Sequence, residues 1–139
     1  MRSTPLLLSL AFGFFALAAG CASQSPVPSV AIGDTVTLRV AESATVEPRN
    51  VVLQFSEVVT DSRCPTDVVC VWEGDAEISV RAVAADGTSS DLRLHTKSGS
   101  EPASFAGLTV RMVSLEPKPR EGTPPRQADY VLTVEIGGR

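Results

Sequence analysis

Apolar and polar residues alternate along most of the chain after residue 30, which is the pattern of strands that bury one face. The alternation is clearest in six stretches, 35–40, 51–56, 76–82, 91–95, 108–112 and 130–136. No window beyond the first 20 residues has a helical period. We therefore expect residues 30–139 to form one all-β domain, an antiparallel β-sandwich (immunoglobulin-like or a small barrel) of about six to eight strands.

The register of one hairpin can be predicted from the turn between stretches 76–82 and 91–95. A two-residue loop would place apolar Val80 opposite charged Arg93, whereas a three-residue loop at 85–87 places it opposite Leu92. Gly87 supplies the left-handed residue that the longer loop needs.

The same register produces favourable pairs on the polar face of this hairpin. Arg81 then faces Asp91, and Glu77 faces His95. Oppositely charged cross-strand neighbours stabilise a sheet by about 0.2 to 1 kcal/mol each. We therefore interpret His95, the only histidine, as a surface residue near Glu77 and not as a base or metal ligand.

The first 20 residues have the features of a secretory signal peptide: basic Arg2, an apolar run too short to span a bilayer comfortably, and small residues before Cys21. The segment LAAGC at 17–21 resembles the lipobox of bacterial lipoproteins, with Ala18 where leucine is usual. This resemblance implies that Cys21 carries a diacylglyceryl group and a further N-terminal fatty acid such as palmitate, so that the chain is attached to a membrane. The alternative is an ordinary secreted protein with Cys21 as a free thiol.

Residues 21–29 are small, polar and proline-bearing, which is typical of a flexible tether. By analogy with enteric sorting, Ala22 in place of aspartate favours the outer membrane of a Gram-negative envelope, with the domain facing the periplasm.

The net charge excludes one class of partner. Without residues 1–20 the chain loses only Arg2, which leaves 11 basic and 16 acidic residues and a net charge of −5. Nucleic-acid binding requires clustered Lys and Arg, so we expect none. We also expect no cofactor and no catalytic residue, because the chain shows no nucleophile with a base beside it.

With Cys21 lipidated in an oxidising compartment, Cys64 and Cys70 form an even pair. Their spacing fits neither a CxxC redox motif nor a zinc site, so we predict a structural disulfide. Trp72, two residues later, is interpreted first as packing over the bridge at the edge of the core. The alternative is an anchor for a binding partner.

Four acids surround this pair of cysteines: Asp61, Asp67, Glu73 and Asp75. Because no calcium-loop spacing is present, we interpret them as solvated loop acids, with Asp61 paired to Arg63, and expect no metal site.

A second segment, 116–127, contains four prolines and the basic residues Lys118, Arg120 and Arg126. The prolines exclude a regular ladder, so we predict a protruding loop. It is either a solvated tip or a binding surface.

The pattern D-S-R-C-P-x₄-C-x-W-x-G resembles that of small predicted envelope lipoproteins from diverse bacteria, and it is filled here by Asp61, Ser62, Arg63, Cys64, Pro65, Cys70, Trp72 and Gly74. The resemblance covers most of the mature chain, including a closing Tyr-containing strand. It implies an envelope location and a β fold, and it transfers no catalytic residue.

We therefore expect a non-catalytic, lipid-anchored module that binds an envelope protein or glycan. The candidate binding residues are Trp72, Arg63, Asp61, Lys118, Arg120 and Arg126. One alternative is an inhibitor of, or protector against, an envelope protease or cell-wall hydrolase, in which a rigid loop enters the enzyme. A weak metal-binding protein is the other.

Overall fold

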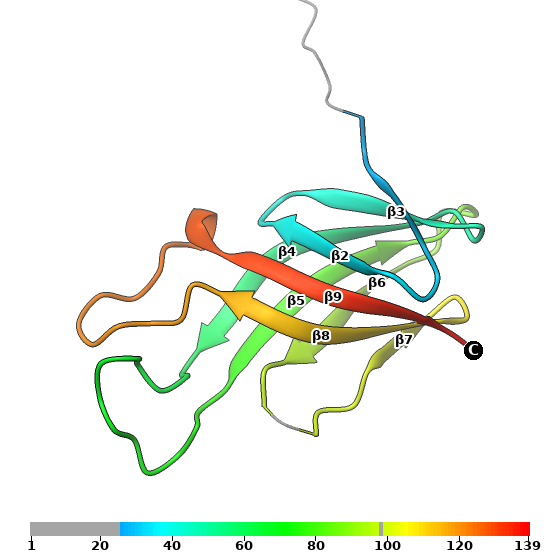
Figure 1. Ribbon diagram of the computed structural model, residues 1–139. Helices are drawn as coiled ribbons and strands as arrows, with labels where there is room; N and C mark the ends of the chain where they lie inside the picture. Colours follow the sequence, from blue (N-terminus) through cyan, green and yellow to red (C-terminus); the bar gives the residue numbers. More distant parts are fainter. Residues whose placement is uncertain (1–25, 98) are drawn as a thin grey trace, which may run out of the picture.

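The computed structural model describes residues 26–97 and 99–139, so the predicted signal peptide and Cys21 lie outside the described residues. Within this part of the chain, no helix is both long and apolar enough to cross a membrane. The strands are β1 (Ser29–Ala31), β2 (Thr35–Arg39), β3 (Ser43–Glu47), β4 (Val51–Asp61), β5 (Ala76–Val83), β6 (Ser89–His95), β7 (Ala103–Phe105), β8 (Leu108–Glu116) and β9 (Val131–Gly138), and a 3-10 turn, η1 (Gln127–Asp129), precedes β9 (Figure 1).

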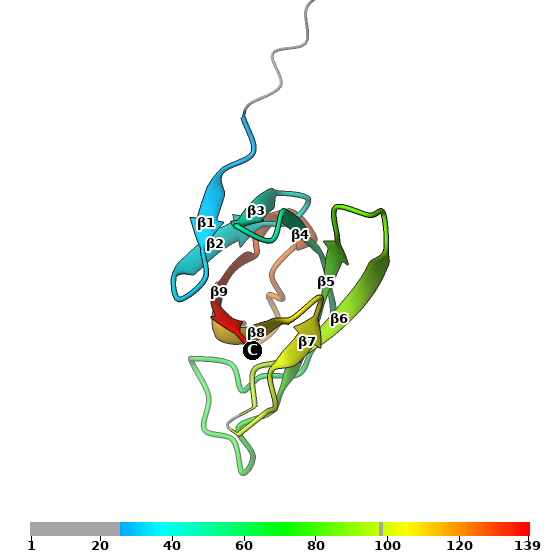
Figure 2. The same ribbon diagram turned by 90° about the vertical axis from the view of Figure 1, so that its right-hand side faces the viewer.

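The strands form two sheets that enclose one core, which confirms the predicted all-β sandwich. One sheet has the order β1-β3-β4-β5-β6 and the other has the order β2-β9-β8-β7. Viewed from the end, the two sheets curve around the buried residues in a nearly closed ring (Figure 2). Phe55 is the largest fully buried side chain.

The predicted hairpin register is confirmed. Val80 lies opposite Leu92, and Arg81 lies opposite Asp91. The loop has three residues, since the amide of Ala84 donates to the carbonyl of Thr88 across 2.8 Å.

Three short strands were not predicted: β1, β3 and β7. β1 and β7 have three residues each, too few to show a period. β1 pairs in parallel with β3, whereas the sequence predicted a sandwich with only antiparallel pairs. In β3 the buried face consists of Ala44 and Val46, and alanine gives a weak apolar signal.

Two strands run further than their alternation indicates, because each contains a β-bulge. In β4 the register shifts between Phe55 and Glu57 and again between Val58 and Thr60. In β8 it shifts between Met112 and Ser114. A bulge exchanges the two faces of a strand, so the period-two pattern breaks while the strand continues. The bulged ends of β4 and β8 carry the two long loops that emerge together at one end of the domain (Figure 1).

Candidate functional site: the stapled loop and its tip

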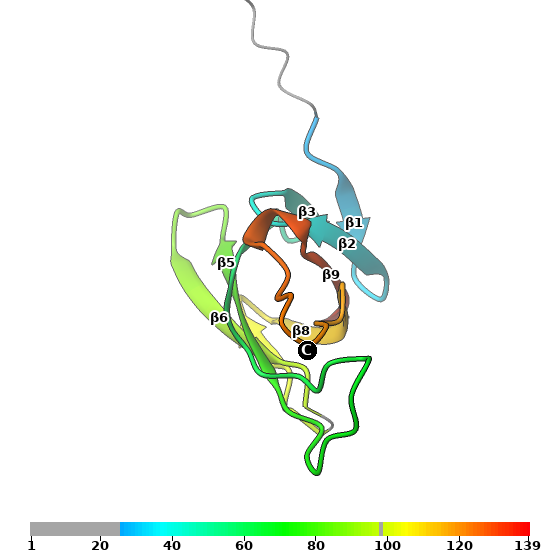
Figure 3. The same cartoon turned by 90° about the vertical axis from the view of Figure 1, so that its left-hand side faces the viewer.

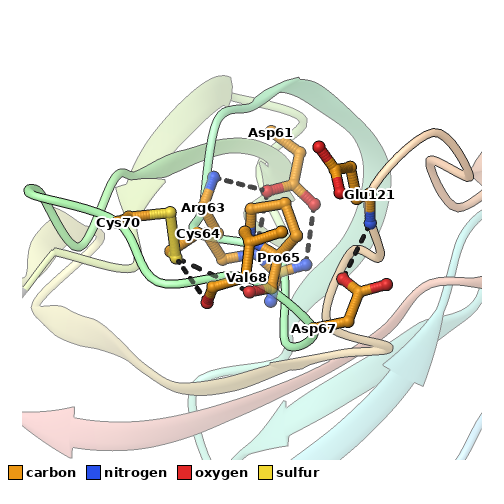
Figure 4. The surroundings of a disulfide bond; sticks show 8 residues. All are labelled: Asp61, Arg63, Cys64, Pro65, Asp67, Val68, Cys70 and Glu121. Atoms are coloured by element: carbon orange, nitrogen blue, oxygen red, sulfur yellow. Dashed lines mark hydrogen bonds and ion pairs between the residues drawn. A yellow bond between two sulfur atoms is a disulfide. The ribbon is translucent and has the colours of Figure 1, made fainter.

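The predicted disulfide between Cys64 and Cys70 is present, with Cα atoms 5.9 Å apart. It closes a ring within residues 62–75, the connection from β4 to β5, which we call the stapled loop (Figure 4). Cys64 is half-buried against the domain, whereas Cys70 is exposed. The stapled loop, green in Figure 3, hangs below the ring of strands, on the side away from β1.

An ion pair between Asp61 and Arg63 fixes the entry to this loop, as predicted. Arg63 Nε lies 2.8 Å from Asp61 Oδ1, and Nη2 lies 2.7 Å from Oδ2, so the guanidinium donates two parallel hydrogen bonds. The side chains are only 8% (Asp61) and 11% (Arg63) exposed. Burial would raise the pKa of Asp61, but the hydrogen bonds from Arg63 and Tyr130 outweigh it and hold that pKa below its ordinary value.

The same guanidinium joins the two sheets. Arg63 Nη1 donates to the carbonyl of Leu115 at 2.5 Å, and Nη2 donates to the carbonyl of Pro117 at 2.8 Å. Leu115 lies in β8, in the sheet that does not contain β4, and Pro117 follows the last residue of that strand. Arg63 and Asp61 therefore hold the stapled loop against the domain, and little of either side chain is left for a partner to contact.

Tyr130 adds a third member to this network. Its hydroxyl donates to Asp61 Oδ2 across 2.9 Å. Burial and this bond to a carboxylate raise the pKa of Tyr130 to about 12, because both disfavour a second negative charge.

The exit of the stapled loop lies directly against its entry. Ser62 donates to the carbonyl of Asp75 through both its amide, at 2.7 Å, and its hydroxyl, at 2.8 Å. Gly74 has φ +70°, and a Cβ built there would lie 2.0 Å from the carbonyl oxygen of Ser62. Only glycine fits this contact.

His95 has a different partner from the one predicted. Its backbone lies opposite Glu77 as expected. However, its Nδ1 lies 2.7 Å from Asp75 Oδ2, while Glu77 pairs with Arg93. The predicted place of His95, exposed and opposite Glu77, is confirmed, and only its side-chain partner differs. Asp75, just before β5, lies against the end of β6, where Thr96 and the amide of Lys97 also donate to it.

The second long connection, 117–126, packs against the stapled loop; we call it the proline-rich loop. The amide of Thr66 donates to the carbonyl of Pro119 at 3.0 Å, and the amide of Glu121 donates to Asp67 Oδ1 at 2.9 Å. The two loops, predicted as separate excursions, thus form one braced structure (Figure 4).

Gln127 is a positioning residue that the sequence did not reveal. Its side-chain amide bonds both the N–H and the C=O of Val58, at 3.0 and 2.6 Å, at the second bulge of β4. A glutamine after a polar loop carries no sequence signal for this role.

The predicted cationic residues are divided between two places. Arg126 pairs with Asp129 at 2.8 Å, next to η1. Lys118 and Arg120 flank Pro119 and are exposed. Among the described residues, neither lies within 4 Å of a carboxylate.

The most exposed large apolar side chains of the described chain lie together at 69–72, which we call the tip. Val69 is 101% exposed, Val71 is 92% exposed and Trp72 is 83% exposed. The expectation that Trp72 packs over the disulfide was therefore wrong. Residues 69–72 point away from the domain. The buried core extends along β4 only as far as Val58.

A groove of about 690 Å³ lies beside the base of the stapled loop and runs along β8. Its charged lining includes Arg63, His95 and Arg111. Arg63 pairs with Asp61 and Arg111 with Glu135, while His95 Nδ1 lies 2.7 Å from Asp75 Oδ2. The lining also carries charged side chains of both signs on Glu73, Lys97, Glu101, Glu116 and Lys118. No group of three or more metal-ligating side chains occurs among residues 26–97 and 99–139.

Comparison of the chain with protein-family models, with curated proteins and with solved structures found no match.

Proposed function

We propose that this chain is a lipid-anchored, non-catalytic recognition module of the bacterial cell envelope that binds a protein partner through the tip of the stapled loop. The signal peptide and the lipobox-like segment ending at Cys21 support the location. The observation that carries the binding role is the exposure of Val69, Val71 and Trp72 at the end of a braced loop.

The cost of exposing these residues supports the proposal. Burial of one such side chain is worth roughly 1.5 to 3 kcal/mol, and the tip leaves three in water. The same loop uses Asp61, Arg63 and Gly74 to fix its base. A fixed apolar projection loses little entropy on docking, which is how rigid loops gain affinity.

The chemistry of the tip favours a protein over a glycan. Valine side chains cannot donate to or accept from sugar hydroxyls, whereas tryptophan and aliphatic side chains fill apolar pockets on proteins. Lys118 and Arg120, on the proline-rich loop packed against the stapled loop, would form a polar rim.

The test is recovery of partners from detergent-solubilised envelopes with the immobilised domain. We expect Trp72→Ala to reduce recovery at least about tenfold, the effect of losing a central aromatic anchor. Val27→Ala is the control, because Val27 is 53% exposed and belongs to the segment before β1, which lies on the side of the domain away from the stapled loop (Figure 1). Equal recovery with wild type and Trp72→Ala would contradict the proposal.

An inhibitor or protector is the second candidate, favoured by the exposure of the tip on a loop that a disulfide closes. Such a projection can occupy the cleft of a protease or cell-wall hydrolase. Adding the purified domain to envelope hydrolases tests this. A lack of inhibition at micromolar concentration would remove the candidate.

A further inference from the structure

We propose that the Cys64–Cys70 disulfide is a redox-sensitive lock on the tip, so that a dithiol reductant releases residues 69–72 while the rest of the domain stays folded. The proposal deepens the recognition role and rests on it, because it concerns regulation of the same surface.

The first half of the ring is held by contacts that do not need the disulfide. The amide of Cys64 donates to the carbonyl of Glu73 at 3.0 Å. Thr66 and Asp67 are bonded to the proline-rich loop at Pro119 and Glu121. Next to them, Arg63 is fixed by Asp61 and by the carbonyls of Leu115 in β8 and of Pro117 just after it.

The end of the ring, Val69 and Cys70, and the two residues after it have no such support. Among the described residues, no hydrogen bond or ion pair involves Val69, Cys70, Val71 or Trp72, and all four are exposed. Two bonds tie this segment to the braced half: the disulfide from Cys70 to Cys64, and, just beyond Trp72, the hydrogen bond from the Cys64 amide to the carbonyl of Glu73. Of the two, only the disulfide ends on one of the four residues. The disulfide therefore fixes the very residues that the recognition role requires.

The exchange reaction balances with a dithiol as reductant. A thiolate of the reductant attacks the sulfur of exposed Cys70, forms a mixed disulfide, and displaces Cys64 as a thiolate that takes up a proton. The second thiol of the reductant then attacks its own sulfur in the mixed disulfide and releases Cys70 as a thiol. Two electrons and two protons pass to the cysteines, and the reductant becomes a cyclic disulfide.

Time-resolved fluorescence anisotropy of Trp72, the only tryptophan, reads the tip alone. In the oxidised protein we expect the slow component, from tumbling of the whole domain, to carry most of the amplitude, beside a minor fast component from motion of the exposed side chain. After treatment of the folded protein with dithiothreitol, a fast component should account for most of the decay, and reoxidation should remove it. A Cys64→Ser, Cys70→Ser double variant should behave like the reduced protein without any reductant.

Circular dichroism of the same samples shows whether the body stays folded. Retained β-sheet signal together with a mobile Trp72 supports the lock. Three results would overturn it: an unchanged Trp72 decay after reduction, loss of the β-sheet signal on reduction, or no reduction of the folded protein by dithiothreitol. Because these readouts use purified protein alone, their failure would leave partner binding by the oxidised tip intact, and failure of partner recovery would leave the lock intact.

Discussion

The hydroxyl of Tyr130 lies 2.9 Å from Oδ2 of Asp61, which joins the residue that leads into β9 to the last residue of β4. Asp61 also receives two hydrogen bonds from the Arg63 guanidinium, so one carboxylate connects both sheets and the stapled loop. The apolar tip projects from this buried polar network.

Titration of Tyr130, the only tyrosine, tests the network directly. Because burial and the Asp61 carboxylate raise its pKa to about 12, the tyrosinate absorbance of the folded protein should have its midpoint near pH 12. Unfolded in urea, it should titrate near pH 10. A folded pKa above the unfolded one stabilises the domain below about pH 10, and this contribution is lost as the pH rises through about 12. A folded midpoint near pH 10 would show that the bond is absent.

Arg63→Ala should destabilise the domain by about 3 kcal/mol, because it leaves the buried Asp61 carboxylate without its partner. Arg63→Lys should restore only part of this loss, since lysine cannot donate two parallel bonds. Urea unfolding measures both. The control is Arg126→Ala, which breaks an exposed ion pair and should leave the unfolding midpoint unchanged. Equal midpoints for Arg63→Ala and wild type would contradict the structural role of Arg63.

Gly74→Ala and Gly87→Ala form a matched pair, because both glycines have positive φ, +70° and +85°. Alanine at 87 meets no atom within 4 Å, so only the backbone cost of about 1 to 2 kcal/mol is expected. Alanine at 74 would collide with Ser62 and should cost roughly 1 to 3 kcal/mol more. Thermal unfolding of the two variants measures both losses of stability. Similar losses would mean that the entry and exit of the stapled loop are not in contact.

Trp72→Ala should change the free energy of unfolding by less than about 0.5 kcal/mol, because the side chain is 83% exposed. Phe55→Ala, in the core, should cost about 3 to 5 kcal/mol. Urea unfolding of both variants therefore separates a recognition residue from a scaffold residue. A large loss of stability in Trp72→Ala would restore the interpretation that Trp72 belongs to the core.

The sequence predicted the sandwich because most strands have a period of two, and it predicted one hairpin because only one register satisfied both faces of 76–82 and 91–95. It missed the far ends of β4 and β8, where bulges exchange the faces. The disulfide followed from the predicted export, the cysteine count and the spacing of Cys64 and Cys70.

The arrangement of the site depended on long-range contacts that no local pattern encodes. The bonds from Arg63 to Leu115, from Thr66 to Pro119 and from Gln127 to Val58 each join residues more than 50 positions apart. The sequence does not reveal these contacts, and a tryptophan beside a disulfide was therefore interpreted as a core residue. These contacts fix the base of the stapled loop against the domain, and the side chains of the tip lie outside the core.

The exposure of Trp72 and its role in binding can both be measured by ¹⁹F NMR of the oxidised domain labelled with 5-fluorotryptophan, which gives one resonance, from Trp72. We predict that this resonance responds to exchange of H₂O for D₂O, as an exposed side chain does, and that it shifts or broadens when solubilised envelope membranes are added. A chemical shift that is the same in H₂O and D₂O would contradict the exposure of Trp72. A resonance that stays unchanged when the envelope fraction is present would contradict its role in binding.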